Sequence, residues 1–323
     1  MKFLTVNEQQ HLYLSETQQP TYTDRQCLVR VKAIGVNRAD ILQKQGLYPP
    51  PPGESTILGL EMSGEIVAVG AQCKTWTVGQ KVFGLVAGGA YAEYVAIEAE
   101  HIMPLPEAYS FVQGAAIAET FLTAYQSLFY IAELVAQQSV LIHAGASGVG
   151  SSAIQLAKAI NCRVVVTVSS DEKGQACLAL GADEYINYQQ QSFVAWAEQY
   201  QPTGFDVILD VVGADYLAKN IDVAAIDGSI IMLALLGGRY APQVDVAKIL
   251  MKRISIHGST LRSRNDSYKT NLIQLFSEKF LFLFSQGQLN PLIDNVYSWQ
   301  IAEQAHQRMS ANLNIGKLIL TIE

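Results

Sequence analysis

Residues 139–160 have the sequence SVLIHAGASGVGSSAIQLAKAI, in which a short apolar run, a glycine-rich turn and a helical pattern follow one another directly. The run Ser139–His143 has the length and composition of a buried strand, and Val149–Ile160 place their apolar side chains at helical spacing. Gly145 permits a tight turn after the strand, and Gly150 permits close packing of the helix against it. A glycine-rich turn between a strand and a helix is typical of dinucleotide binding.

The predicted binding turn places backbone N–H groups at the start of a helix, where they can face the pyrophosphate of a dinucleotide. Its residues are Gly145, Ala146, Ser147, Gly148, Val149 and Gly150. Ser147 stands where the usual G-x-G-x-x-G pattern has its middle glycine, which is a departure from that pattern. Because the turn lies in a β-α-β context, we still expect it to bind a dinucleotide.

The segments after this turn continue the alternation of strands and helices. Three further runs are apolar almost throughout: Arg163–Val168, Phe205–Gly213 and Gly228–Leu236. A helical stretch ending at Gly181 separates the first two runs. Strands that are apolar throughout and alternate with helices indicate a parallel sheet covered on both faces. We therefore predict a doubly wound α/β domain of the Rossmann type.

The first 120 residues have a different pattern. Cys27–Ala33 and Gly64–Gly70 are β-prone segments among frequent glycines and prolines, which indicates an antiparallel, barrel-like domain. The tail adds an amphipathic helix over Leu272–Phe284 and a strand over Gly316–Leu320. The α/β domain is thus predicted to be inserted in a β-rich one. The predicted bounds are 1–121 completed by 263–323 for the β-rich domain, and 122–262 for the α/β domain.

The composition disfavours several classes of protein. Half of the 323 residues are hydrophobic and 16% are charged, which is too apolar for intrinsic disorder. A formal net charge of −7 lacks the basic excess typical of nucleic-acid binding. The apolar run Ile230–Leu236 is far shorter than the ~20 residues of a spanning helix, and the N-terminus lacks a secretory apolar core. We expect a cytoplasmic protein with no membrane partner.

The cysteines and histidines give no sign of a metal site. Cys27, Cys73, Cys162 and Cys177 lie far apart without a C-x-x-C pair, which disfavours a disulfide framework and a structural zinc site. No group of Cys, His and carboxylate residues has the spacing of catalytic zinc ligands. We therefore predict no metal.

The residues that follow the strand Arg163–Val168 bear on the choice of dinucleotide. NAD enzymes place a carboxylate there for the ribose 2′-OH, whereas cationic groups accommodate the 2′-phosphate of NADP. Ser169 and Glu172 have the spacing of a capping box, which gives the Glu172 carboxylate a structural role. Lys173 and the serines Ser169 and Ser170 then remain to receive a phosphate, which favours NADP. The alternative is that Lys173 is a solvated helix residue.

Several short blocks occur in a fixed order along nearly the whole chain. They are NRAD (37–40), QGLYPPPPG (45–53), ILGLE (57–61), LTAY (122–125), LIHAGASGVG (141–150), AIQL (153–156), INY (186–188), LRSR (261–264) and NIGK (314–317). In this order the chain resembles the NADPH:quinone oxidoreductases of the zeta-crystallin-like branch of the medium-chain dehydrogenase/reductase superfamily, particularly the stress-inducible quinone oxidoreductases. Zinc-dependent relatives have a Gly-His-Glu motif where this chain has Leu60, so the resemblance implies a zinc-independent enzyme.

The resemblance also implies a fold, a cofactor and roles for single residues. It implies a Rossmann-type domain inserted in a GroES-like β-barrel-type domain, NADPH as cofactor, and a homodimer or higher homo-oligomer. Matched residue by residue, it implies that Lys173 and Tyr188 hold the 2′-phosphate, that Thr123, Val212, Leu235 and Leu236 lie near the nicotinamide, that Tyr48 lines the cofactor and substrate cleft, and that Asn314 closes it. Alternatively Tyr48 packs on its proline-rich loop, Tyr188 ends a strand and Thr123 caps a helix.

The reaction expected from this resemblance is hydride transfer from NADPH to a quinone. Hydrogen bonds from Tyr48 or Asn37 would stabilise the developing negative charge, with solvent as the proton source. One alternative is reduction of the C=C bond of an alkenal, an enone or an enoyl thioester. Another is a crystallin-type or RNA-binding protein that binds NADPH without turnover. The sequence leaves open whether one or two electrons reach the quinone.

Overall fold

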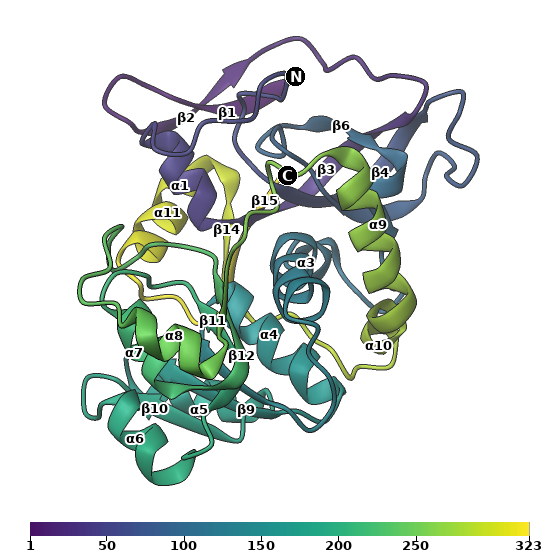
Figure 1. Ribbon diagram of the computed structural model, residues 1–323. Helices are drawn as coiled ribbons and strands as arrows, with labels where there is room; N and C mark the ends of the chain where they lie inside the picture. The colour runs from purple at the N-terminus through teal and green to yellow at the C-terminus, as the bar shows by residue number, and fades with distance from the viewer. Residues whose placement is uncertain (323) are drawn as a thin grey trace. The chain divides into compact units, whose positions relative to one another are not determined.

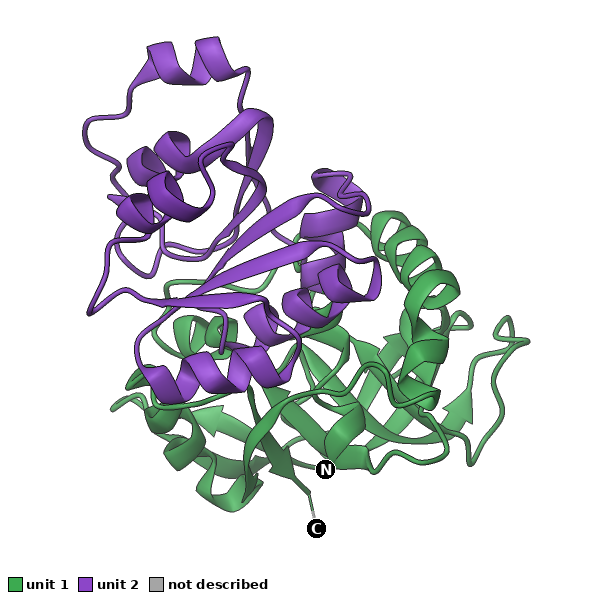
Figure 2. Ribbon diagram, turned by 90° about the horizontal axis from the view of Figure 1, so that it is seen from below, with its two compact units in different colours: residues 1–122, 262–323 green, residues 123–261 purple. Residues whose placement is uncertain are grey.

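The structure is a computed structural model that describes residues 1–322 and divides into two compact units (Figure 1). The first unit comprises Met1–Leu122 and the chain from Arg262 onward, and the second comprises Thr123–Leu261, as Figure 2 shows by colour. The sequence placed these boundaries after residues 121 and 262. The second unit is therefore a continuous segment inserted into the first.

The inserted unit is built on six parallel strands in the spatial order β10-β9-β8-β11-β12-β13. Its strands are β8 (Ser139–His143), β9 (Arg163–Val168), β10 (Glu184–Asn187), β11 (Phe205–Asp210), β12 (Ala224–Met232) and β13 (Ser255–Gly258). Its helices are α4 (Gly148–Ala159), α5 (Asp171–Ala179), α6 (Phe193–Tyr200), α7 (Tyr216–Val223) and α8 (Val246–Lys252), preceded by a π-helical turn η2 (Gln126–Ile131). The predicted doubly wound parallel sheet is confirmed.

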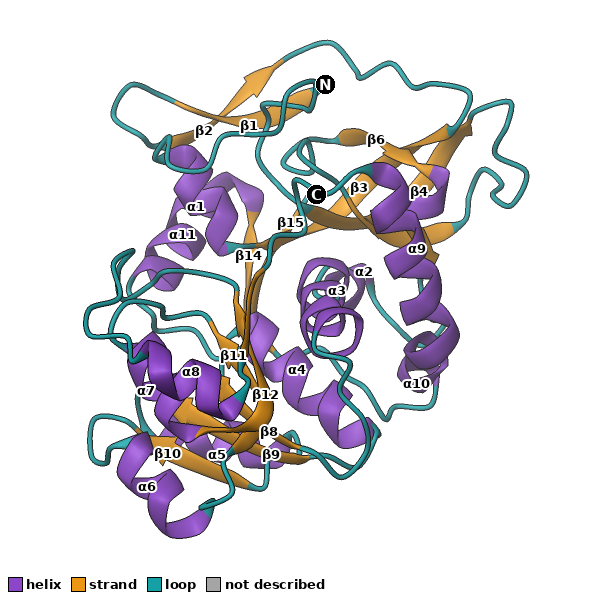
Figure 3. Ribbon diagram, in the orientation of Figure 1, coloured by secondary structure: helices purple, strands orange, loops and turns teal. Residues whose placement is uncertain are grey.

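Helices cover both faces of this sheet, with α4 on one side and α7 and α8 on the other (Figure 3). The side chains of the central strands β8 and β9 are therefore buried on both faces, which explains their unbroken apolar runs. The order of the strands reverses next to β8, since β9 lies on one side of it and β11 on the other. In such sheets, ligands bind beyond the carboxyl ends of the strands at the point of reversal.

The first unit is a mainly antiparallel β structure. A seven-stranded sheet has the order β14-β15-β3-β4-β5-β7, β6 pairs with β3, and β1 pairs with β2. Its strands are β1 (Lys2–Val6), β2 (Leu12–Glu16), β3 (Gln26–Val36), β4 (Glu61–Val69), β5 (Lys81–Leu85), β6 (Tyr94–Glu98), β7 (Ile102–Pro104), β14 (Ile293–Ser298) and β15 (Lys317–Thr321). The antiparallel pair β15–β3, with Leu318 opposite Val36, joins the two chain segments that form this unit.

The helices of the first unit are short. Its longest continuous helical stretch, residues 266–285, comes after the inserted unit in the sequence. The helices are α1 (Arg38–Lys44), η1 (Ala99–His101), α2 (Phe111–Gly114), α3 (Ala118–Tyr125, which ends in the second unit), α9 (Asp266–Phe276), η3 (Ser277–Leu281), α10 (Phe282–Ser285), η4 (Trp299–Ile301) and α11 (Ala302–Ser310). The helix predicted over Leu272–Phe284 is the end of α9, the π-helical turn η3 and most of α10. Within residues 1–322, no helix is long and apolar enough to cross a membrane.

Candidate cofactor and substrate site

The glycine-rich turn at the carboxyl end of β8 is packed too tightly for side chains at its two outer glycines. A Cβ on Gly145 would lie 2.6 Å from the Val166 side chain on β9. A Cβ on Gly150 would lie 2.6 Å from the carbonyl oxygen of Gly145 and closer still to that of Ala144. The N–H of Gly145 donates to the carbonyl of Thr167 at 3.1 Å, which holds the turn against β9. Both glycines are therefore required by packing.

The same turn ends in the N-terminus of α4. Ser147, the residue in place of the middle glycine, is the N-cap of this helix, and its Oγ accepts a hydrogen bond from the N–H of Gly150 at 3.0 Å. The N–H groups of Gly148 and Val149 have no helical carbonyl four residues earlier to bond. They lie at the positive end of the helix dipole, so this terminus fits the pyrophosphate of a dinucleotide.

The structure corrects the capping box predicted after β9. The helix α5 begins at Asp171, and its N-cap is Ser170, whose side chain accepts a hydrogen bond from the N–H of Lys173 at 3.3 Å. The box of Ser169 and Glu172 is wrong by one residue, because the backbone of Ser170 is still extended. Lys173 is the third residue of α5, where a capping box has Glu or Gln. A lysine side chain cannot accept the hydrogen bond from the N–H of the N-cap residue, so no capping box forms here.

The segment after β10 lies against these residues. Tyr188 donates its backbone N–H to the carbonyl of Val168 at 3.1 Å, and the residue is 46% exposed. The Asp171 carboxylate accepts hydrogen bonds from the side chains of Asn187 at 3.0 Å and Gln190 at 3.4 Å. The Asp171 carboxylate is thus bonded to side-chain amides. Of the predicted phosphate ligands, Ser169, Ser170 and Lys173 follow β9, and Tyr188 follows the neighbouring strand β10.

The apolar residues matched to the nicotinamide pocket lie at the carboxyl ends of β11 and β12. The N–H of Leu236 donates to the carbonyl of Val211 at 3.3 Å, and the N–H of Gly237 donates to the carbonyl of Val212 at 2.8 Å. Leu235 and Leu236 are both about half exposed. The structure therefore brings Val212, Leu235 and Leu236 together at the same edge of the sheet as the glycine-rich turn.

A buried carboxylate that the sequence analysis did not identify organises the end of β11. The Asp210 carboxylate accepts hydrogen bonds from the N–H groups of Val212 at 2.7 Å and Gly213 at 3.0 Å. Its other oxygen accepts from the side-chain amide of Asn220 at 3.0 Å. These bonds fix the backbone that carries Val212. The available sequence signal was a carboxylate directly after the apolar run of residues 207–209.

The network continues through His143, the last residue of β8. His143 Nε2 lies 2.7 Å from the amide oxygen of Asn220, and Nδ1 lies 3.0 Å from the hydroxyl of Thr167 on β9. Burial lowers the pKa of His143, although Asp210 opposes this effect. The neutral ring therefore donates from Nε2 to Asn220 and accepts at Nδ1 from Thr167. The ends of β8, β9 and β11 are tied together by this chain of polar side chains.

Thr123 and Asn314 are held by local contacts. Thr123 is the sixth residue of α3, and its carbonyl accepts a hydrogen bond from the Ser127 hydroxyl at 2.7 Å. The alternative role as a helix cap is therefore wrong for Thr123. Asn314 lies in the loop before β15 and donates its side-chain amide to the carbonyl of Gly316 at 2.8 Å.

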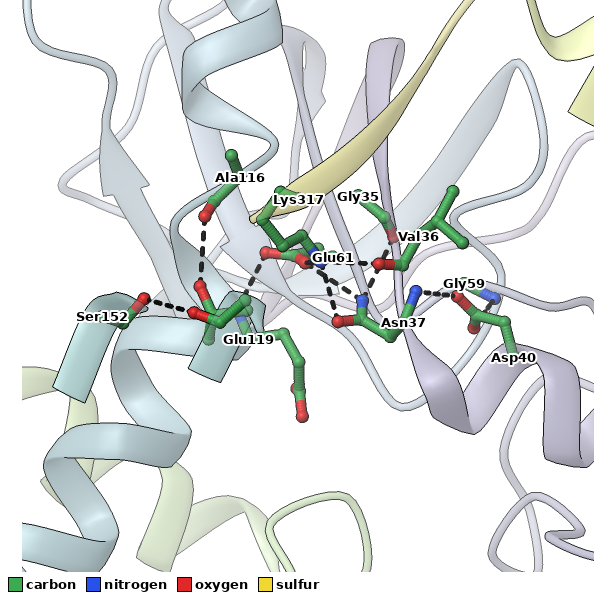
Figure 4. Close-up of polar contacts among 12 residues, drawn as sticks. Gly35, Val36, Asn37, Asp40, Gly59, Glu61, Ala116, Glu119, Ser152 and Lys317 are labelled. Atoms are coloured by element: carbon green, nitrogen blue, oxygen red, sulfur yellow. Dashed lines mark hydrogen bonds and ion pairs between the residues drawn. The ribbon is translucent and has the colours of Figure 1, made fainter. Parts of the chain in front are cut away.

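Asn37 lies in a buried polar cluster of the first unit (Figure 4). Its amide donates to the carbonyl of Gly35 at 3.1 Å and to Glu61 Oε1 at 3.0 Å, and its oxygen accepts from Lys317 Nζ at 2.8 Å. Lys317 also contacts Glu61 Oε1 at 2.6 Å and the carbonyl of Val36 at 2.7 Å. The side chain of Asn37 is thus bonded on all its polar hydrogens and on its oxygen to groups of the chain itself.

A second buried group lies beside this cluster. Asp40 accepts hydrogen bonds from the N–H groups of Asn37 at 2.8 Å and Gly59 at 3.1 Å, and from the Tyr91 hydroxyl at 3.3 Å. The Tyr91 oxygen lies 2.9 Å from Nε2 of His306. Burial raises the pKa of Asp40 to about 6 and lowers the pKa of His306 to about 4. The two groups therefore titrate in overlapping ranges with opposite consequences for stability.

Tyr48 follows α1 and is half-buried. The guanidinium of Arg262 lies over its ring, 5.5 Å from the centroid. Burial raises the pKa of the Tyr48 hydroxyl, the nearby Glu119 carboxylate acts in the same direction and Arg262 opposes both. No residue among 1–322 forms a hydrogen bond with this hydroxyl, so it is a protonated donor available to another molecule.

The residues of the described chain show no ready-made metal site. Among residues 1–322, no three or more His, Cys, Asp or Glu side chains are grouped so that they could hold a metal ion. Leu60, at the position of the zinc-binding histidine of zinc-dependent relatives, is a buried core residue. Zinc independence itself stays a prediction.

Comparison with known proteins gives consistent matches over both units. The family model described as "Alcohol dehydrogenase GroES-like domain" matches residues 23–107, and that described as "Zinc-binding dehydrogenase" matches residues 148–278. The synaptic vesicle membrane protein VAT-1 homolog of Danio rerio is 33% identical over 94% of this chain, which spans 66% of that relative. The quinone oxidoreductase of Homo sapiens is 30% identical over 94% of this chain and 91% of its own length. The solved structure of the CurK enoyl reductase has a TM-score of 0.88 and 25% identity, covering 100% of this chain and 99% of that one.

Proposed function

Because the chain belongs to the quinone oxidoreductase-like part of the medium-chain dehydrogenase/reductase superfamily, we propose that it transfers hydride from NADPH to quinones without zinc. Oxidoreductase chemistry with a nicotinamide cofactor follows from the superfamily, whereas NADPH and the quinone are our proposal. The observation that supports the proposal is that the glycine-rich turn, the serines after β9 and Tyr188 lie at the carboxyl ends of adjacent parallel strands.

We assign the parts of the cofactor to these residues by their chemistry. The N-terminus of α4 would hold the pyrophosphate, because its N–H groups and dipole favour an anion. Ser169, Ser170, Lys173 and Tyr188 would hold the 2′-phosphate, since hydroxyls and an ammonium favour a second anion. When bound, NADPH supplies the hydride. Nicotinamide contacts of Thr123, Val212, Leu235, Leu236 and Asn314 stay predictions from the family resemblance.

Tyr48 and Asn37 of the first unit would have different roles. The Tyr48 hydroxyl, protonated and without a partner in the described chain, would donate a hydrogen bond to the acceptor oxygen as negative charge develops. Asn37 was predicted to do the same, but its amide is bonded to Gly35, Glu61 and Lys317. We therefore propose that Asn37 positions the start of α1, the helix that precedes Tyr48.

A second candidate acceptor is a conjugated C=C bond. The likeness to the CurK enoyl reductase over the full chain favours it, and so does the 30% identity to the prostaglandin reductase-3 of Mus musculus. Initial rates with 1,4-naphthoquinone and with trans-2-hexenal separate the two acceptors. A much larger kcat/KM for the alkenal would replace the quinone assignment, and binding of NADPH without turnover of either acceptor would favour the non-enzymatic alternative.

The cofactor assignment is tested by titrating NADPH and NADH against the wild type, Lys173→Ala and the control Gln175→Ala. Gln175 is an exposed residue of the same helix, so its replacement leaves the proposed phosphate site intact. A hydrogen bond between charged groups contributes about 1.5–3 kcal/mol, so Lys173→Ala should weaken NADPH binding by about 10–100-fold. NADH affinity should change little. Equal losses for both cofactors would show that Lys173 does not contact the 2′-phosphate.

The remaining parts of the proposal concern metal and assembly. Activity that persists after dialysis against a chelator, in protein shown to be free of zinc, is the result expected for a zinc-independent enzyme. The homodimer and the cytoplasmic location stay predictions.

A further inference from the structure

Arg262 is a buried cation without a counter-ion. It is 5% exposed, and its Nε donates to the carbonyl of Ala87 at 2.7 Å. Neither Nη1 nor Nη2 has a hydrogen-bond partner, and no carboxylate of residues 1–322 forms an ion pair with this side chain. Buried charges are normally paired, because desolvating an unpaired charge is costly. An unpaired buried guanidinium therefore needs an explanation other than stability.

Its surroundings hold the guanidinium in one orientation. Nε is held by the bond to the Ala87 carbonyl, and the guanidinium carbon lies 5.5 Å from the centroid of the Tyr48 ring. The two Nη groups are thereby left as a fork next to a tyrosine whose hydroxyl is also unpartnered. Burial lowers the pKa of Arg262, and the nearby Tyr48, Asp40, Glu119 and Glu54 oppose this effect. A guanidinium stays charged in proteins, so the fork is cationic.

Two other cations of the described part of this unit, Lys317 and Arg264, lack this combination. Lys317 is as deeply buried, but its ammonium is bonded to Glu61, Asn37 and the carbonyl of Val36. Arg264, two residues after Arg262, also lies over a tyrosine ring, that of Tyr268 at 4.6 Å, but it is exposed. Arg262 is thus both buried and incompletely bonded, which is the state expected of a group that binds an anion from outside the chain.

We propose that Arg262 binds a negatively charged oxygen of the acceptor, together with the hydroxyl of Tyr48. This inference rests on the proposed function, and it adds a charge requirement to the acceptor. A planar fork of N–H donors matches a carboxylate or an oxyanion, and such bonds are strongest where water is excluded. The oxygen belongs either to a carboxylate that the acceptor already carries or to the carbonyl that becomes negative during reduction.

The second case follows from the electron balance of the reaction. The acceptor carbon gains a hydride and forms a new C–H bond, while the conjugated π electrons move onto the carbonyl oxygen. The reduced cofactor loses that hydride and is oxidised. Arg262 and Tyr48 stabilise the oxygen anion until a proton from solvent gives the neutral product.

The test compares Arg262→Gln with the exposed control Arg264→Gln on a matched pair of acceptors, 4-oxopent-2-enoate and its methyl ester. These acceptors share the conjugated carbonyl and differ only in the carboxylate. If Arg262 binds the carboxylate, Arg262→Gln raises KM for the acid by about 100-fold and leaves the ester unchanged. If it binds the developing oxyanion, kcat falls by about 100-fold for both. Either result supports the proposal, and Arg264→Gln should match the wild type.

Two results would overturn it. In the first, Arg262→Gln reduces both acceptors with wild-type kcat and KM. In the second, the variant loses NADPH affinity, measured by fluorescence titration, by the same factor as activity, which would assign Arg262 to the cofactor. Arg262→Lys keeps the charge but not the fork, and we expect a loss of about 10-fold. If the glutamine variant fails to fold, wild-type kinetics in Arg262→Lys overturn the proposal.

A wild type that reduces neither acceptor excludes these enones as acceptors, whereas the quinone assignment is decided by the 1,4-naphthoquinone assay. Calorimetric titration with 4-oxopentanoate, an acid that cannot accept the hydride at a conjugated bond, then tests the anion site. Binding to the wild type with at least 10-fold weaker binding to Arg262→Gln supports the site. Equal binding to both proteins, or no binding to either, rejects it.

Discussion

Replacing Lys317 by methionine should destabilise the protein strongly, because it leaves a carboxylate buried without its cation. The Lys317 ammonium lies 2.6 Å from Glu61 Oε1, and the two side chains are 4% and 0% exposed. Methionine keeps most of the side-chain volume but not the charge. Glu61 would keep hydrogen bonds from the Asn37 amide and the Glu119 N–H only. Breaking a buried pair in this way costs about 3–5 kcal/mol.

Calorimetric or circular-dichroism melting measures this loss. For a chain of 323 residues, 3–5 kcal/mol corresponds to a fall in melting temperature of about 4–7 °C. The exposed pair Arg25–Glu100, at 3.3 Å with side chains 64% and 53% exposed, provides the control. Arg25→Met should lower the melting temperature by less than about 1.5 °C.

A double variant tests the physical reason for the loss. Removing the second charge by Glu61→Gln in the Lys317→Met background should recover part of the stability, because no buried charge then remains. A melting temperature for Lys317→Met equal to that of the wild type would refute the reasoning. So would a double variant that is no more stable than the single one.

Four further outcomes are expected. The pKa of His306 is lowered from 6.5 to about 4 in the folded protein, so between these pH values the unfolded chain binds more protons than the folded one. The wild type therefore loses stability as pH falls through this range. His306→Gln lacks this loss and should gain up to about 3 kcal/mol relative to the wild type between pH 6.5 and 4. In that variant, the raised pKa of Asp40 should make stability increase as pH falls from 6 to 4, and a melting temperature that does not change over this range would contradict the sign for Asp40. Gly150→Ala should weaken dinucleotide binding in direct titration, since a Cβ there overlaps the carbonyl of Ala144, and unchanged affinity would exclude the close turn. Asn220→Ala should lower the melting temperature by leaving two buried partners unbonded, whereas Asn220→Asp should not mimic the wild type.

The parallel sheet was predictable because its central strands β8, β9 and β11 are buried on both faces and are therefore mostly apolar. It was also predictable that the residues directly after those strands lie near one another, because the carboxyl ends of parallel strands lie at one edge of the sheet. The cap of α5 was misplaced by one residue because Ser169 and Ser170 are equally good caps, and only the length of β9 decides between them.

The contacts of Asn37 could not be predicted, because they depend on residues that are remote in sequence. Asn37 and Glu61 are 24 residues apart, and Lys317 lies 280 residues after Asn37. Lys317 lies next to Asn37 and Glu61 because β15, which follows the inserted unit in the sequence, pairs antiparallel with β3, which precedes it. Arg262 was visible only as part of the LRSR block, because burial and the lack of a counter-ion are properties of the folded chain.

Oxidation of the nicotinamide cofactor by zinc-free protein, with 1,4-naphthoquinone as acceptor and NADPH and NADH compared at equal concentration, tests the central claim most directly. The account predicts steady oxidation that requires both protein and quinone and is faster with NADPH. Binding of NADPH without turnover, or equal rates with the two cofactors, would contradict it.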